Sequence, residues 1–159
     1  MLTRLLPEQV SKFWDVIKYA IEESLPPIAG EHPDKMNRIL SSALSGNLTV
    51  WVSYIIDGEV KRLEAVLCTR ILYDDVSNTR NLLIYCFYGY ENIDSQSYVD
   101  GIRALAKYAV AKHCSQVIAY TDIEYVKQVV NYLGGESKYT FLSFDVPKII
   151  HKINELEKK

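Results

Sequence analysis

The stretch from Arg80 to Ala111 has the residue types and order of a binding site for an anionic ligand. It opens with an apolar and aromatic run, Leu82 to Tyr88, that is typical of a strand buried on both faces. Gly89 interrupts the run, a short polar and acidic loop follows, and a helix is expected to begin at Asp94 or Ser95. The first N–H groups of that helix and the positive end of its dipole then point out of the sheet, where they can hold an anion.

The other chemically active side chains do not form a known catalytic or metal-binding arrangement. Cys68 and Cys86 lie in apolar strand-like runs and Cys114 follows a helix end, with no Cys-x-x-Cys pair, so buried, reduced thiols are expected. No histidine is near Cys86 in the sequence to activate it as a nucleophile, and no serine lies in a nucleophile elbow. No two histidines have the spacing of metal ligands, so we expect no metal site. The three histidines are His32, His113 and His151.

Composition and charge are those of a globular protein of one domain. The 159 residues are 48% hydrophobic and 24% charged, and twenty acidic against eighteen basic residues give a formal net charge of −2. Apart from the terminal Lys158-Lys159 pair the sequence has no basic run, which argues against tight binding to nucleic acid. The first ten residues lack the apolar core of a signal peptide, and no run reaches membrane-spanning length. We therefore expect a cytoplasmic protein, and packaging into a particle assembled in the cytoplasm stays open.

Hydrophobic periodicity predicts an α/β fold. The first six residues are either a short strand or a loose lead-in. Helices are expected from Pro7 to near Leu25, Pro33 to Leu44, Asp94 to Ala111, Asp122 to Leu133 and from Pro147 onward, and strands from Leu48 to Ile56, Val60 to Tyr73, Arg80 to Tyr88, Gln116 to Thr121 and Tyr139 to Val146. The first three of these strands form an antiparallel meander, and a strand–helix–strand crossover places the next strand parallel. This order predicts a mixed, mostly antiparallel sheet with helices on both faces.

Several short pieces of the sequence occur in an order that is similar to one known family. These pieces are Phe13-Trp14, Gly46 to Val52, Leu82 to Gly89, Ala106-Lys107 with His113-Cys114, and Tyr132 to Gly135. Together with the predicted elements they resemble a GNAT-type N-acyltransferase domain over roughly Leu5 to Val146, most closely the compact GNAT-like proteins encoded by tailed bacteriophages. The resemblance implies one GNAT-like domain over residues 1–146 and a C-terminal helix extension over residues 147–159.

The resemblance implies that the protein transfers an acetyl or other acyl group from acyl-CoA, its implied cofactor, to an amine. The pyrophosphate of acyl-CoA is then expected on N–H groups at the start of the central helix, with the thioester beside the end of the preceding strand. The implied cofactor-binding residues are Phe87, Tyr88, Gly89, Asn92, Ser95, Gln96 and Ser97.

The loop that would hold the pyrophosphate departs from the family pattern. The family has an arginine or glutamine followed by spaced glycines, whereas residues 90–96 contain neither glycine nor a basic residue and include Glu91 and Asp94. A carboxylate about 6 Å from a phosphate charge costs roughly 2–3 kcal/mol at an effective dielectric near 20. The alternative is that these carboxylates cap the N-terminus of the helix, as acidic residues commonly do.

The same resemblance implies two catalytic side chains. Many members of the family place a tyrosine four residues before the glycine that ends the fourth helix, where it protonates the leaving thiolate. Counting back from Gly134 gives Val130, so Tyr132 is the candidate acid, although out of register. The family often uses a carboxylate on the central strands as the base, and Glu64 is the candidate because it is the one acidic residue within the three predicted meander strands. Since Glu64 alternates with apolar neighbours, the other interpretation is that it faces solvent.

Two functions are compatible with such a fold. The first is an active N-acyltransferase with a degenerate cofactor loop, acting on an unidentified amine. The second is a catalytically inactive binding or structural module, such as a virion or assembly protein of a phage or a protein that contacts a host protein. The C-terminal helix is expected to dock on a neighbouring subunit through Ile149, Ile150 and Ile153, which would make the protein a homo-oligomer.

Overall fold

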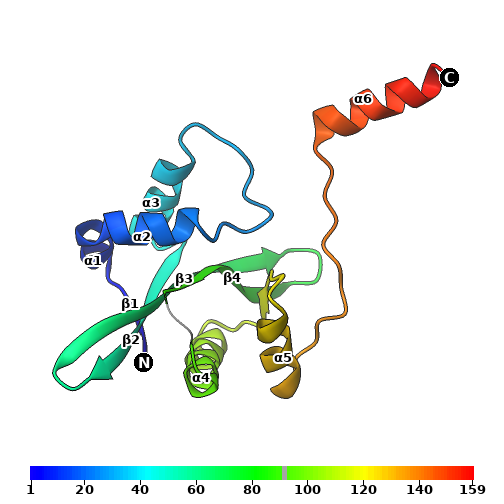
Figure 1. Cartoon of the computed structure of the whole chain (residues 1–159). Coiled ribbons are helices and arrows are strands. Elements are labelled where there is room, and N and C mark those ends of the chain that lie inside the picture. The colour runs from blue at the N-terminus through cyan, green and yellow to red at the C-terminus, as the bar shows by residue number, and fades with distance from the viewer. Residues whose placement is uncertain (91–92) are drawn as a thin grey trace. The chain divides into compact units, whose positions relative to one another are not determined.

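The computed structural model describes residues 1–90 and 93–159, and the chain forms two compact units. The first unit comprises Met1–Asp122 and the second Ile123–Lys159 (Figure 1). The boundary expected at residue 146 lies inside the second unit, and the assignment of a separate C-terminal extension stays a prediction.

The first unit is built on a five-stranded mixed sheet with strand order β1-β2-β3-β4-β5. Its strands are β1 (Leu2–Arg4), β2 (Thr49–Asp57), β3 (Val60–Asp74), β4 (Thr79–Gly89) and β5 (Gln116–Ala119). The first four strands pair antiparallel, and β5 pairs parallel with β4. A tight turn at Gly58 connects β2 and β3, with φ at +63°, a conformation that glycine adopts without steric cost. The predicted meander and crossover are confirmed.

Helices cover both faces of this sheet, as the sequence predicts (Figure 1). On one face lie α1 (Pro7–Lys12), α2 (Trp14–Glu22) and α3 (Lys35–Ser45), and on the other lies α4 (Ser95–Ala111). Burial of large apolar side chains, worth roughly 1.5–3 kcal/mol each, holds the helices on the sheet. The core of the first face includes Val10, Ile17, Ile21, Val50 and Val66, and that of the second face consists of Trp51, Leu67, Leu82, Leu105 and Ala109.

The N-terminal segment differs from the prediction in one respect. The single helix expected from Pro7 is divided at Phe13, whose backbone leaves helical values at φ −106° and ψ 19°. Because the chain turns there, α1 and α2 point in different directions (Figure 1), and each buries its own apolar residues, Val10 in α1 and Ile17 in α2. Apolar residues recur at helical spacing on both sides of the break, so the sequence does not reveal it. Of the two expectations for the first six residues, the short strand is correct, since β1 pairs with β2.

The second unit contains two helices joined by a segment without regular structure. The helices are α5 (Glu124–Tyr132) and α6 (Val146–Glu157), both of which the sequence predicts. The strand predicted from Tyr139 to Val146 is wrong, since all residues from 123 to 159 are described and none of them forms a strand. A strand needs a hydrogen-bonded neighbour as well as a suitable sequence, and this unit holds no other strand to provide one. Tyr139, Leu142 and Phe144 are accordingly 86%, 80% and 74% exposed.

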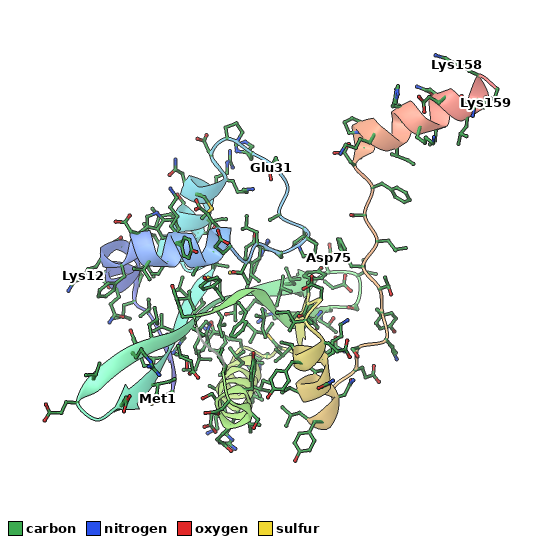
Figure 2. All side chains as sticks on the ribbon, in the orientation of Figure 1. Met1, Lys12, Glu31, Asp75, Lys158 and Lys159 are labelled. Carbon is green, nitrogen blue, oxygen red and sulfur yellow. The ribbon has the colours of Figure 1, made fainter. Side chains whose placement is uncertain are left out.

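α6 begins as its sequence predicts. Pro147 lies in the first turn, and the Asp145 carboxylate caps the helix by accepting a hydrogen bond from the Lys148 N–H at 3.0 Å. The helix ends just before Lys158 and Lys159, which are labelled in Figure 2. Ile150 and Ile153 are 53% and 42% exposed, so the apolar stripe exists, and its docking on a second copy of the chain stays a prediction. No helix in the described part of the chain has the length and hydrophobicity that crossing a membrane requires.

The turn between α3 and β2 requires a glycine, and a substitution there tests this requirement. Gly46 ends α3 in the left-handed conformation, at φ +85°, which costs other residues about 1–2 kcal/mol. Gly46→Ala should therefore lower the free energy of unfolding by about 1 kcal/mol in urea denaturation. Gly30→Ala is the matched control, because Gly30 lies outside the left-handed region and an added Cβ at either glycine meets no atom within 4 Å. Equal stability of the two variants would contradict the argument.

Candidate functional site

A β-bulge buries the candidate base Glu64 on strand β3. Ser53 of β2 pairs with Ala65 of β3, and the next residue, Tyr54, pairs with Leu63, so that Glu64 has no residue opposite it. The extra residue shifts the in–out alternation by one, and Glu64 is only 2% exposed. The interpretation that Glu64 faces solvent, which assumed an unbroken alternation, is therefore wrong.

Only one oxygen of the Glu64 carboxylate has a hydrogen-bond partner among the described residues. Ser53 Oγ donates a hydrogen bond to Oε2 at 2.7 Å, while Oε1 has no hydrogen-bond partner in the described part of the chain. The other buried polar side chain, Thr69, is satisfied, since its Oγ1 accepts a hydrogen bond from Trp51 Nε1 at 2.9 Å. A buried carboxylate oxygen without a partner costs free energy, so Oε1 is suited to meet a hydrogen-bond donor or cation of a ligand.

The end of strand β4 lies directly beside Glu64. Gly89 pairs with Ala65, Tyr88 with Val66 and Phe87 with Leu67, so the three predicted residues of β4 run along the strand that carries Glu64. The Tyr90 N–H donates a hydrogen bond to the backbone oxygen of Glu64 at 2.9 Å, which joins the two strands at this point. The structure therefore brings the candidate base together with the residues predicted beside the thioester.

The aromatic residues at this strand end lie on opposite faces of the sheet. Phe87 belongs to the core under α4 and its ring lies 6.1 Å from that of Tyr98, at the start of the helix. Tyr88 packs on the other face, edge-on between Tyr19 of α2 at 5.7 Å and Tyr90 at 4.9 Å. Burial, with a smaller contribution from Tyr88, raises the pKa of Tyr90, whose hydroxyl has no partner among the described residues.

The N-terminus of α4 is capped by the protein's own carboxylate. Asp94 Oδ1 accepts a hydrogen bond from the Ser97 N–H at 2.8 Å, which confirms the capping alternative for this residue. Gln96 is also engaged, since its Nε2 donates to Asp100 Oδ1 at 3.0 Å, and Asp100 in turn accepts a hydrogen bond from Arg103 at 2.8 Å. Ser95 begins the helix. Two of the groups predicted for pyrophosphate binding are thus already in use, and Glu91 and Asn92 lie outside the described residues.

The candidate acid Tyr132 lies in the second unit. It is the last residue of α5, and its side chain is 86% exposed. Gly134, which follows the helix, adopts φ +83° and so ends the helix as the sequence predicts. The catalytic role of Tyr132 stays a prediction.

Sequence reasoning did not single out Ser53. A lone serine in the apolar run Thr49 to Ile56 is the signal that could have found it, because a polar residue in a buried strand needs a polar partner. The partner could not be named, since it depends on the bulge. Among the described residues, no group of three or more histidine, cysteine or acidic side chains could hold a metal ion.

Comparison with known proteins identifies the fold through solved structures alone. No protein-family model matches the sequence, and no curated protein does. Solved structures do match: AAC(6')-Iy in complex with a CoA bisubstrate analogue (14% identity, TM-score 0.64, covering 91% of this chain and 96% of that one), and glucosamine-6-phosphate N-acetyltransferase from Arabidopsis thaliana (13%, 0.61, 91% and 97%). A predicted acetyltransferase from Clostridium acetobutylicum, solved with acetyl-CoA, matches at 10% identity and a TM-score of 0.63, covering 93% and 97%. At these identities the similarity shows the fold alone, and the expected GNAT-like fold is confirmed.

Proposed function

We propose that the protein is an N-acyltransferase that transfers an acyl group from acyl-CoA to an amine, with Glu64 as the base. The observation that carries the proposal is the buried Glu64 carboxylate beside the end of β4, whose Oε1 has no hydrogen-bond partner among the described residues. A residue kept only for packing would be apolar or would have both oxygens satisfied, whereas a general base needs one oxygen available to the reacting amine.

Each predicted residue has a role in this proposal. Glu64 Oε1 accepts the proton of the attacking amine, and the hydrogen bond from Ser53 holds the carboxylate in place. Bound acyl-CoA would supply the activated acyl group. The end of β4 at Phe87, Tyr88 and Gly89 lines the position of the thioester. Asn92, Ser95, Gln96 and Ser97 would contact the pyrophosphate, and Tyr132 would protonate the thiolate.

The capped helix supports a second candidate function. For the Ser97 N–H to bind a phosphate oxygen, the Asp94 carboxylate must move away, since it now accepts that hydrogen bond. If it does not move, the fold is a catalytically inactive binding or structural module, for which a phage virion or assembly protein is the proposed setting. Its partner would then be a protein rather than an amine substrate.

Thermal unfolding with acetyl-CoA separates the two functions. At a hundred times its dissociation constant a ligand stabilises the folded state by about 2.7 kcal/mol. At about 2–4 °C per kcal/mol, this should raise the melting temperature by about 5–10 °C in differential scanning fluorimetry. AMP at the same concentration is the control for binding through the nucleotide alone. An unchanged melting temperature at millimolar acetyl-CoA would contradict the acyltransferase and favour the binding module.

A further inference from the structure

Two buried cysteines face each other across strands β3 and β4. Cys68 and Cys86 are direct partners in the antiparallel register, and both belong to the apolar core beneath α1, α2 and α3. Cys68 is 0% and Cys86 5% exposed, and both are reduced. Neither residue has a role in the proposed function, so the chemistry of this pair is independent of it.

The strand register favours a disulfide between these two residues. Residues directly opposite each other in an antiparallel pair have Cα atoms about 4.5–5.5 Å apart and side chains on the same face. Disulfide-bonded cysteines have Cα atoms about 4.4–6.8 Å apart, so the two ranges overlap. Cys68 and Cys86 end a stretch of consecutive pairs that begins with Ala65 and Gly89, and the register shifts immediately after them, between Cys68 and Thr69.

The pKa values of the two thiols shift in opposite directions. Hydrogen bonding with Cys86, together with burial, raises the pKa of Cys68 well above its usual range. Hydrogen bonding with Cys68 lowers the pKa of Cys86 because it stabilises the thiolate, while burial acts in the opposite direction. We therefore expect Cys86 to be the sulfur that reacts first with an oxidant, since the thiolate is the reactive form and Cys68 is its direct partner across the strands.

We propose that Cys68 and Cys86 form a cross-strand disulfide when the folded protein meets a peroxide. The Cys86 thiolate attacks one oxygen of hydrogen peroxide, breaking the O–O bond and giving a sulfenic acid and hydroxide, which takes up a proton to become water. The Cys68 sulfur then attacks the sulfenic sulfur, and the hydroxyl group leaves as a second water after taking the Cys68 proton. In sum, two thiols are oxidised and one peroxide is reduced to two waters.

The disulfide would tie β3 to β4 on the strands that carry the candidate site. Cys68 lies four residues after Glu64 on β3, and Cys86 three residues before Gly89 on β4. The cross-link would fix the register between the two strands three pairs away from the Ala65–Gly89 pair. It would close a loop of nearly twenty residues, which stabilises a folded chain chiefly by restricting the unfolded one.

The test uses the full chain carrying Cys114→Ser, so that only the paired cysteines remain. After treatment of the folded protein with hydrogen peroxide, we expect an intact mass about 2 Da lower, no thiol that can be alkylated after denaturation, and a peptide linking Cys68 to Cys86. The oxidised protein should melt about 5–10 °C higher. Dithiothreitol should restore the original mass and the original melting temperature. Peptide mapping of the unsubstituted chain repeats the measurement without any substitution.

Other products would overturn the proposal. The amino acid cysteine in the same solution is the control for the strength of the peroxide treatment. If that cysteine is oxidised while the protein keeps two alkylatable thiols, the pair does not react. A disulfide-linked dimer, sulfinic acids without a linked peptide, or a disulfide formed only in denaturant would show that the folded pair does not form the bond. The same oxidation applied to Cys86→Ala in the Cys114→Ser background should give no mass lower by 2 Da.

Discussion

Glu64→Gln should lower the rate of acyl transfer by about 100- to 1,000-fold and also raise the melting temperature by about 2–4 °C. The rate falls because an amide cannot take the proton of the attacking amine. The stability rises because a neutral amide is less costly to bury than a carboxylate whose Oε1 has no partner in the described chain. The amide oxygen can still accept the hydrogen bond from Ser53, so the fold is preserved. A gain in stability together with a loss of activity is the trade-off expected of an active-site residue.

The measurement combines thiol release from acetyl-CoA, over a panel of primary amines, with thermal unfolding. Glu59→Gln is the matched control, because Glu59 is exposed in the turn that joins β2 and β3 and should change neither quantity. Ser53→Ala should lower the melting temperature, since it removes the hydrogen bond that the Glu64 carboxylate accepts from Ser53 Oγ. If Glu64→Gln lowered the melting temperature and left the rate unchanged, the carboxylate would be structural. The thermal result stands whether or not an amine acceptor is found.

The sequence predicted those elements that depend on local pattern. The runs on either side of Gly58 gave β2 and β3 nearly to the residue, and the apolar spacing after Asp94 gave α4. The failures occurred where a distant part of the chain decides. The strand expected from Tyr139 has a suitable sequence and no neighbouring strand in its unit. Phe13 breaks a helix whose apolar residues continue at helical spacing on both sides.

In the candidate site, too, the sequence predicts what depends on local pattern and misses what depends on distant parts of the chain. That Asp94 caps a helix can be predicted from its position before Ser95, because the capping hydrogen bond spans three residues. The burial of Glu64 cannot be predicted from the sequence, because the bulge that turns its side chain inward is a property of two paired strands. Cys68 and Cys86 lie opposite each other because of the register between β3 and β4. The sequence pattern of a single strand does not determine that register.

Asp94→Ser should tighten the binding of acetyl-CoA by about 3- to 10-fold if its pyrophosphate lies at the N-terminus of α4. Serine retains an oxygen that can cap the helix, so the helix is kept while the negative charge is removed. A carboxylate about 6 Å from a phosphate charge costs between about 0.7 kcal/mol in water and about 2.8 kcal/mol at an effective dielectric of 20, and an exposed residue such as Asp94 lies toward the lower value. The dissociation constant is measured by isothermal titration calorimetry, and the gain should shrink as salt is added.

Asp75→Ser is the matched control for this measurement, because it removes the same charge from an exposed turn. Asp75, labelled in Figure 2, lies between β3 and β4, at the opposite end of β4 from Gly89. A gain confined to Asp94→Ser would place the phosphate charge beside the capped helix. Equal dissociation constants for both variants and the unsubstituted chain would show that the ligand binds elsewhere. If neither the unsubstituted chain nor Asp94→Ser binds acetyl-CoA at millimolar concentration, then the acidic cap is not what prevents binding, and the fold functions without the cofactor.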